Sequence, residues 1–164
     1  MEQVNETVIV TKQAFHAVGL RWEGTFAEAG AGGIRVIHQE LQQRYEEIQG
    51  IVDPDNFFGL SYQAYPGGSG FTHYAVFEVS SVDHIPDGMV AIQVPTMRYA
   101  KCEHRAEQSI DRSYHNIYAW MEQQGLKAPL QDGEGLTHFE VYPRRQDPYS
   151  THPEFTIMIP ILEG

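Results

Sequence analysis

A short stretch of the sequence occurs twice, and this repeat limits the possible fold more than any other feature. FFGLSYQAYPGG at 57–68 resembles EGLTHFEVYPRR at 134–145, so that Gly59–Leu60 corresponds to Gly135–Leu136 and Tyr65–Pro66 to Tyr142–Pro143. The spacing within the match differs by one residue, which predicts a β-bulge in one copy. Internal repeats of this kind indicate a duplicated structural unit.

The predicted elements around the two copies follow the same order. β-Forming residues between turn signals predict strands, and apolar residues at spacings of three and four predict amphipathic helices. In the first half these patterns predict a strand at 14–22, a helix at 34–48 and a hairpin of strands at 57–65 and 72–80. In the second half they predict extended segments at 88–95 and 97–106, a helix from Glu107, Ser109 or Asp111 to Gly125, and strands at 135–143 and 153–161. The small residues at 23–33, including GAGG, predict a flexible loop beside a cleft.

We therefore expect a single α+β domain, 1–164, made of two half-repeats at about 14–80 and 88–162. Each half is a strand–helix–strand–strand unit, and the strands would merge into one antiparallel sheet with both helices on one face. The opposite face would be free to form a ligand cleft at the pseudo-twofold seam between the halves.

The charge of the chain bears on its partners. Eleven Lys and Arg against 22 Asp and Glu give a formal charge of −11, which disfavours direct nucleic acid binding and favours cationic partners. The same acidity is also a common route to solubility. The sequence has a single cysteine, Cys102, and shows no signal peptide and no apolar run that could span a bilayer. We expect a cytoplasmic protein with no membrane association.

Glu140 is the residue that most strongly suggests a functional site. It lies in a run of strand-forming residues, and strand alternation places it on one face with His138 and Tyr142, while Phe139 and Val141 share the other face. The apolar pair is expected to pack on the helices, and the polar trio to face the cleft. A carboxylate in a cleft can bind a cation or act as a general acid or base. The alternative is an exposed position on an edge strand.

Aromatic residues could complete a site for a lipophilic cation, because aromatic faces attract cations and offer a large contact area. The candidates for ligand contact beside Glu140 are Trp22, Tyr65, Trp120, His138, Tyr142 and Met158. The eight histidines show none of the spacings of zinc motifs, and the chain has neither a Walker motif nor GxGxxG. No metal and no cofactor are therefore expected.

Four segments together resemble the GyrI-like, or effector-binding, superfamily: FHAVGLRWEGT, YHNIYAWMEQQGL, LTHFEVYP and PEFTIMIPI. The resemblance covers about Ala14 to Ile161, and it implies a duplicated β-α-β-β fold with a ligand cleft at the seam. It also implies that Glu140 engages lipophilic cations in an aromatic pocket, followed by the family's tyrosine at Tyr142, and that Trp120 borders this pocket. No helix-turn-helix region precedes the domain in this sequence, unlike the multidrug regulators of the superfamily.

The leading hypothesis is a stand-alone protein that binds small lipophilic or cationic compounds. One alternative, which the resemblance also implies, is a hydrolase of reactive cyclopropane-type toxins in which Glu140 activates water. Another is a protein-binding inhibitor such as a gyrase modulator. A protein partner or a homodimer is compatible with each of these hypotheses, since one fold hosts many functions.

Overall fold

The computed structural model describes residues 3–65, 68–129 and 135–162, and it has the α+β architecture expected from the sequence. Pro66 and Gly67, in the predicted hairpin turn, lie outside the described residues, as does most of the loop before Gly135. The strands are β1 (Thr7–Lys12), β2 (Phe15–Gly24), β3 (Asn56–Tyr62), β4 (Phe71–Val79), β5 (Val90–Val94), β6 (Met97–His104), β7 (Leu136–Pro143) and β8 (Phe155–Pro160). The helical segments are α1 (Phe26–Glu28), η1 (Ala29–Gly33), α2 (Ile34–Gln43), η2 (Tyr45–Glu47) and α3 (Ile110–Gln123).

All eight strands belong to one antiparallel sheet with the order β1-β6-β8-β7-β3-β4-β2-β5. Exchanging each strand of the first half with its counterpart in the second (β1 with β5, β2 with β6, β3 with β7, β4 with β8) reverses this order. The duplication is thus visible in the topology, and its pseudo-twofold seam lies between β3 and β7. At this seam the register shifts beside Ser61 and Tyr62, which leaves Thr137 as the bulged residue of β7.

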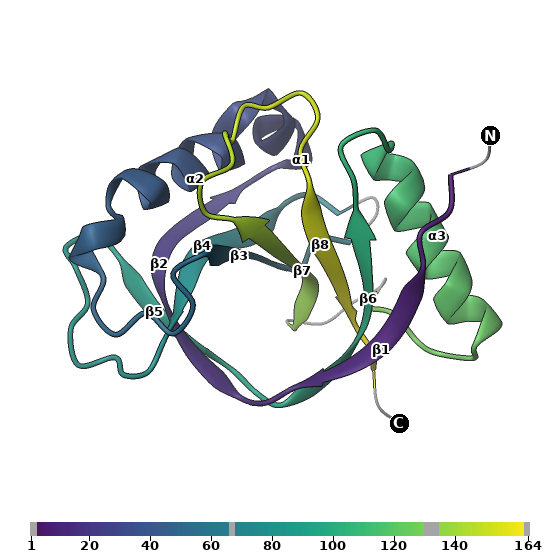
Figure 1. Ribbon diagram of the computed structural model, residues 1–164, viewed down its shortest axis with the longest axis horizontal. Coiled ribbons are helices and arrows are strands. Elements are labelled where there is room, and N and C mark those ends of the chain that lie inside the picture. The colour runs from purple at the N-terminus through teal and green to yellow at the C-terminus, as the bar shows by residue number, and fades with distance from the viewer. Residues whose placement is uncertain (1–2, 66–67, 130–134, 163–164) are drawn as a thin grey trace.

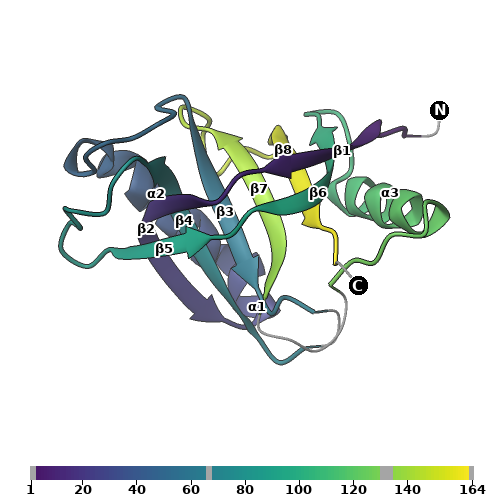
Figure 2. The same cartoon turned by 90° about the horizontal axis from the view of Figure 1, so that it is seen from below.

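Each half also contributes a strand to the sheet of the other. β1 continues into β2 but pairs with β6, and β5 continues into β6 but pairs with β2. The two continuous ribbons, β1–β2 and β5–β6, therefore run beside each other, as Figure 2 shows. Each half therefore has one strand more than a strand–helix–strand–strand unit. The extra strand of the second half, β5, falls on the extended segment predicted at 88–95, whereas β1 was not predicted.

The helices lie on one face of the sheet, above its two flanks (Figure 1). Beneath α2, Leu41 packs with Val18 of β2, Phe57 of β3 and Phe77 of β4. Beneath α3, the side chains of Ile117 and Met121 pack on β6 and β8. This burial of apolar surface is the main force that holds both helices on the sheet. No helix in the described part of the chain is long and apolar enough to cross a membrane.

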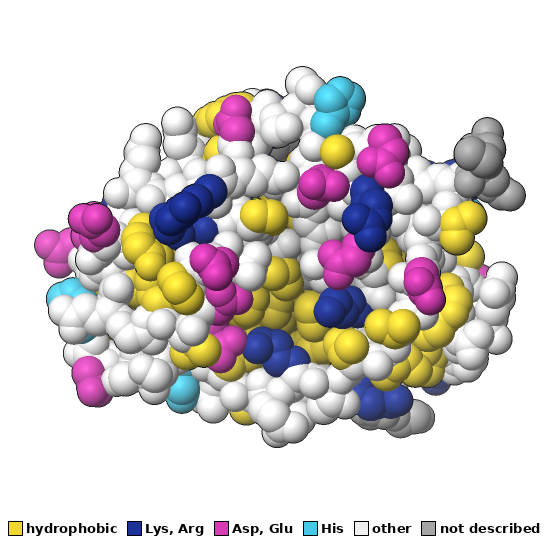
Figure 3. All heavy atoms as spheres, viewed as in Figure 1, with side chains coloured by type: hydrophobic (Ala, Val, Ile, Leu, Met, Phe, Trp, Pro, Cys, Tyr) yellow, Lys and Arg dark blue, Asp and Glu magenta, His cyan; other side chains and the backbone are white. Residues whose placement is uncertain are grey.

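The face without helices is covered by the two ribbons, which enclose a second core. Phe139 of β7 is fully buried there, with ring centroids 5.8 Å from Phe15, 4.8 Å from Phe58 and 5.3 Å from Tyr99. In the space-filling view of Figure 3, hydrophobic side chains gather in the area that the ribbons frame in Figure 1. The expectation that Phe139 packs on the helices and that the cleft lies on the opposite face is therefore wrong.

Residues 23 and 24 end β2 and residues 26–33 are helical, so the prediction of a flexible loop at 23–33 is wrong. Thr25 caps the segment: its hydroxyl accepts a hydrogen bond from the Glu28 amide at 3.1 Å, and the Glu28 carboxylate accepts one from the Thr25 amide at 2.9 Å. This capping box starts a helix that continues through η1 into α2 with a kink at Gly32, whose φ of 115° favours glycine.

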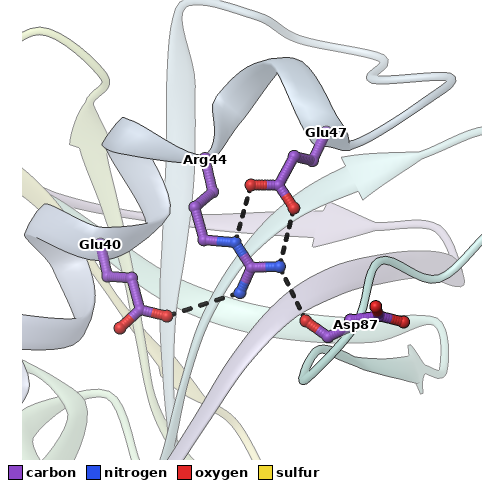
Figure 4. Close-up of polar contacts among 4 residues, drawn as sticks. All are labelled: Glu40, Arg44, Glu47 and Asp87. Atoms are coloured by element: carbon purple, nitrogen blue, oxygen red, sulfur yellow. Dashed lines mark hydrogen bonds and ion pairs between the residues drawn. The ribbon is translucent and has the colours of Figure 1, made fainter.

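The other end of α2 is anchored by Arg44 (Figure 4). Its guanidinium donates two hydrogen bonds of 2.8 Å to the Glu47 carboxylate, one to Glu40 at 3.5 Å and one to the Asp87 carbonyl at 2.7 Å. These contacts end the α-helix and join it to the loop before β5. The helix that faces the site is thus fixed at both ends.

Candidate functional site

A cavity of about 680 Å³ lies on the helix side of the sheet, between α2 and α3 and above the seam strands β3 and β7. This volume is typical of a small-molecule site. Residues 34, 35, 38 and 42 of α2 line one wall, and residues 110, 111, 114 and 118 of α3 line the other with identical spacing. The two repeats therefore contribute equivalent helix positions, but with different side chains. The segment 143–155 and α1 complete the cavity, and residues 143–155 form the loop between the two helices in Figure 1.

Glu140 lies among the strand residues of this cavity, with Gly59 of β3 and Ile157 of β8 as its cross-strand neighbours. Its Oε1 accepts a hydrogen bond of 2.8 Å from the Tyr142 hydroxyl, and its Oε2 accepts one from the Tyr114 hydroxyl of α3. None of the ion pairs formed by the described residues includes Glu140. The carboxylate is therefore held by two neutral donors and has no neutralising cation.

The protonation of these groups follows from their burial. Burial raises the pKa of Glu140 above its ordinary value of 4.5, although the two tyrosine hydrogen bonds partly oppose the shift. Burial, with the adjacent Glu140 charge, raises the pKa of Tyr114 and Tyr142 well above 10. Both tyrosines thus stay protonated at neutral pH and remain donors to the carboxylate.

Glycine at position 59 makes room for the rings beside Glu140. A Cβ there would lie 3.0 Å from Cε1 of His73 and 3.2 Å from Cε2 of Tyr142, which is tighter than ordinary van der Waals contact. The Tyr142 ring stacks on Phe57 with centroids 5.4 Å apart and on Phe155 at 5.0 Å. The hydroxyl that holds Glu140 is therefore positioned by an aromatic stack across three strands.

Aromatic rings are prominent in the walls of the cavity, and its charge is negative. Seven phenyl or phenol rings line it: Phe26, Phe57, Phe71, Tyr114, Tyr118, Tyr142 and Phe155. Its charged side chains are one cation, Arg35, and three carboxylates, Asp111, Glu140 and Asp147. Aromatic faces and an excess of negative charge both favour a cationic ligand with apolar surface.

His138 extends the polar network on the α3 side. Its Nε2 lies 3.1 Å from the Tyr118 hydroxyl, and burial lowers its pKa to about 4, so the ring is neutral near pH 7. On the α2 side, His38 and His73 are in contact through their Nε2 atoms, 3.0 Å apart. Among the residues that the structure describes, no group of three or more His, Cys, Asp or Glu side chains could hold a metal ion.

The structure brings three of the seven candidate residues together in the cavity: His138, Glu140 and Tyr142. The other four lie outside its lining. Trp22 packs against Phe71 with centroids 5.3 Å apart and so supports the wall from behind. Trp120 packs with the core beneath α3, and Met158 is buried in the core on the opposite face of the sheet. Tyr65 follows the end of β3. A role in ligand binding stays a prediction for all seven residues.

Among the helix residues, the sequence connected only Trp120 with the pocket. His38 and Tyr114 are not among the candidates, yet both lie on cavity walls at equivalent positions. Aligning the two helices by the repeat would have shown polar or aromatic residues at matching positions of both.

The fold and the cavity together define an effector-binding domain of the GyrI-like type, as the sequence resemblance implied. A sequence model of the Cass2 family, integron-associated effector binding proteins, matches residues 8–161, and the chain belongs to this family.

Comparison with known proteins shows where related domains occur. The transcriptional regulator BrlR of Pseudomonas aeruginosa is 31% identical over 156 residues, which cover 93% of this chain and 54% of BrlR. The chain thus spans about half the length of this curated relative.

Two solved structures share the fold at low sequence identity. The C-terminal domain of EcmrR superposes with a TM-score of 0.71 at 13% identity, over 99% of this chain and 100% of that domain. SAV2435 bound to tetraphenylphosphonium superposes with a TM-score of 0.68 at 13% identity, over 96% of this chain and 94% of SAV2435.

Proposed function

We propose that the protein binds lipophilic cations in the cavity between α2 and α3, with Glu140 as the counter-ion and the surrounding rings as walls. The observation that carries this proposal is the Glu140 carboxylate, which is half-buried among aromatic side chains and accepts its hydrogen bonds from two neutral tyrosine hydroxyls. A buried charge without a partner costs free energy, and a bound cation recovers part of that cost. The tetraphenylphosphonium bound to the similar SAV2435 supports this ligand class.

Titration calorimetry with tetraphenylphosphonium tests the proposal. We expect saturable binding to the wild type and a roughly 10- to 100-fold loss of affinity in Glu140→Gln, because the charge-assisted contact is lost. Glu46→Gln removes the same charge from an exposed position outside the cavity lining and serves as the matched control. The neutral compound triphenylphosphine oxide should bind far more weakly than the cation. Equal affinities in wild type and Glu140→Gln would remove Glu140 from the site.

Hydrolysis is a second candidate, favoured by the raised pKa of Glu140. A carboxylate with a raised pKa is a stronger base, and Glu140 could deprotonate a water that attacks a planar electrophile held by the rings. Turnover of a cyclopropane-bearing alkylating agent by the wild type, and its loss in Glu140→Gln, would establish hydrolysis. Binding of the agent without product formation would leave binding as the function. Gyrase inhibition stays a prediction that a supercoiling assay can test.

A further inference from the structure

Three side chains on the α2 side of the cavity form a hydrogen-bonded chain that the proposed cation site does not use. Ser61 Oγ lies 2.8 Å from Nδ1 of His73, and Nε2 of His73 lies 3.0 Å from Nε2 of His38. All three residues line the cavity, and their fractional exposures are only 8% for Ser61, 1% for His73 and 5% for His38. His38 lines the cavity, and its second ring nitrogen, Nδ1, makes no hydrogen bond to the described residues and is not among their fully buried unpaired polar atoms, so it keeps accessible surface.

Both histidines are neutral near pH 7. Burial lowers the pKa of His38 to about 4 and the pKa of His73 well below its ordinary value of 6.5. A neutral imidazole has one donor and one acceptor nitrogen, and here each choice fixes the next. If the Ser61 hydroxyl donates to His73, then His73 donates to His38, and Nδ1 of His38 carries a proton into the cavity. If His73 donates to Ser61, then His38 donates to His73, and its Nδ1 becomes an acceptor.

This chain lies close enough to Glu140 for one ligand to reach both. The Tyr142 ring contacts the His38 ring with centroids 4.9 Å apart, and the hydroxyl of the same tyrosine is 2.8 Å from Glu140 Oε1. His38 also occupies the position on α2 that Tyr114 occupies on α3. The two sides of the cavity are therefore related by the repeat but differ in chemistry: the α3 side has a carboxylate with tyrosines and His138, and the α2 side has the imidazole pair backed by Ser61 and no carboxylate in that chain.

We propose that His38, backed by His73 and Ser61, is a second, hydrogen-bonding subsite, and that the preferred ligands are aromatic cations carrying a hydroxyl, carbonyl or amino group. A polar nitrogen facing a largely apolar cavity is poorly satisfied, and a ligand group that bonds to it removes that cost. Since the chain can offer either a donor or an acceptor, it suits each of these groups. This inference rests on the cation site proposed above.

The test compares tetraphenylphosphonium with its mono-hydroxylated derivatives, in which one phenyl ring carries a meta or a para hydroxyl. The charge and the shape are nearly the same, so the difference in affinity reports the hydroxyl alone. We expect at least one isomer to bind the wild type about five- to tenfold more tightly than the parent ion, the range of one net hydrogen bond.

Two variants assign the preference to His38. His38→Phe keeps a ring against Phe57 and Tyr142 but removes both nitrogens, and it should bind all the probes with nearly equal affinity. His38→Gln restores a donor and an acceptor and should recover part of the preference. Glu140→Gln should weaken every probe by a similar factor and leave the preference in place.

The failures of the two proposals are distinguishable. If the wild type binds the parent ion and its derivatives equally, or if folded His38→Phe keeps the preference, the subsite is overturned while the cation site stands. If the wild type binds none of the probes, the cation site fails and the subsite with it. Equal binding of all the probes by the wild type overturns the subsite even if His38→Phe does not fold, and His38→Gln then serves as the variant that reports on His38.

Discussion

In the proposed cation site, Glu140 would stabilise a bound cation at the expense of the stability of the empty protein. Because its pKa is raised on folding, the protonated form is favoured in the folded state, and its contribution to stability is present below about pH 4.5 and lost as pH rises through the raised pKa. Glu140→Gln cannot ionise, so it avoids the stability lost when the carboxyl becomes charged, and its side-chain oxygen still accepts a hydrogen bond from one tyrosine hydroxyl. The variant should therefore be more stable than the wild type at pH 7, with the advantage shrinking towards pH 4.

Urea unfolding at several pH values measures this difference. An advantage that stays constant with pH, or a variant less stable than the wild type at pH 7, would contradict an unpaired buried carboxylate. Binding of tetraphenylphosphonium to the wild type should weaken over the same range as Glu140 becomes protonated. The same residue is thus expected to limit stability and to confer affinity.

Gly59 is the residue that tests the aromatic stack. In Gly59→Ala the added Cβ would press on the rings of His73 and Tyr142, with approaches of 3.0 and 3.2 Å. We expect a loss of about 1–3 kcal/mol in unfolding free energy, the usual cost of overpacking, and weaker cation binding as Tyr142 moves from Glu140. Ala at Gly135, where a Cβ would meet nothing within 4 Å, is the matched control. Thermal unfolding measures the stability of both variants, and calorimetry measures their affinity for the cation. If Gly59→Ala matches the Gly135→Ala control in both, the added Cβ does not displace the rings.

Among the elements, α1 and η1 connect local sequence most directly to the site, since Phe26, Ala29 and Gly30 line the cavity. Thr25→Ala removes the hydroxyl cap and should cost about 1 kcal/mol of stability and some affinity. Thr25→Ser keeps the cap and should behave like the wild type. If the alanine variant matches the serine variant in urea midpoint and in affinity, the capping box does not position α1 and η1 at the cavity.

The elements also show what the sequence could and could not predict. The strands of both hairpins, α3 and most of α2 were predicted correctly, because each carries a clear period or turn signal. The helical segment at 26–33 was missed, since its glycines indicate a loop and only the capping residues Thr25 and Glu28 argue otherwise. Strand β1 was missed because Val8, Ile9 and Val10 are consecutive apolar residues, so the sequence there shows no two-residue alternation, and in the structure Val8 and Ile9 are both exposed.

The face of β7 that bears the site could be predicted only in part. Alternation correctly placed His138, Glu140 and Tyr142 on one face and Phe139 on the other. It could not tell which face the helices cover, because both faces of this strand are covered. A choice between them required the ribbons, whose pairing joins residues that lie far apart in the sequence.

At the scale of the whole molecule, the exchange of β1 and β5 couples the two halves. The register of β1 with β6 runs from Thr7–Cys102 to Lys12–Met97. Asn5 also bonds to Gln108, just before α3, and to Asn116 within α3. Removing residues 1–12 should therefore destabilise the second half, loosen α3 with Tyr114, and weaken cation binding. The loss should be a large part of the roughly 5–15 kcal/mol that stabilises typical domains.

Labelling of Cys102 gives a direct readout of this coupling. The thiol is 2% exposed, and burial raises its pKa to about 11, so it should react slowly in the full chain and much faster in the shortened one. Val8→Thr, at an exposed position of β1, is the control that keeps the strand. Equal labelling rates in the full and shortened chains would show that the second half closes without β1.

The pairing of the two ribbons, β1–β2 and β5–β6, also limits the order in which the strands of the nascent chain can fold. β1 leaves the ribosome first, but its partner β6 is made only after the whole of the first half and β5. Until then an unpaired strand with exposed Val8 and Ile9 is available to other chains, and the pairing that ends this state spans a long sequence separation, which slows folding. Slowing translation once β6 has emerged from the ribosome should therefore give β1 time to find its partner, whereas a pause before β6 emerges should prolong the exposure of β1 and its demand for chaperones.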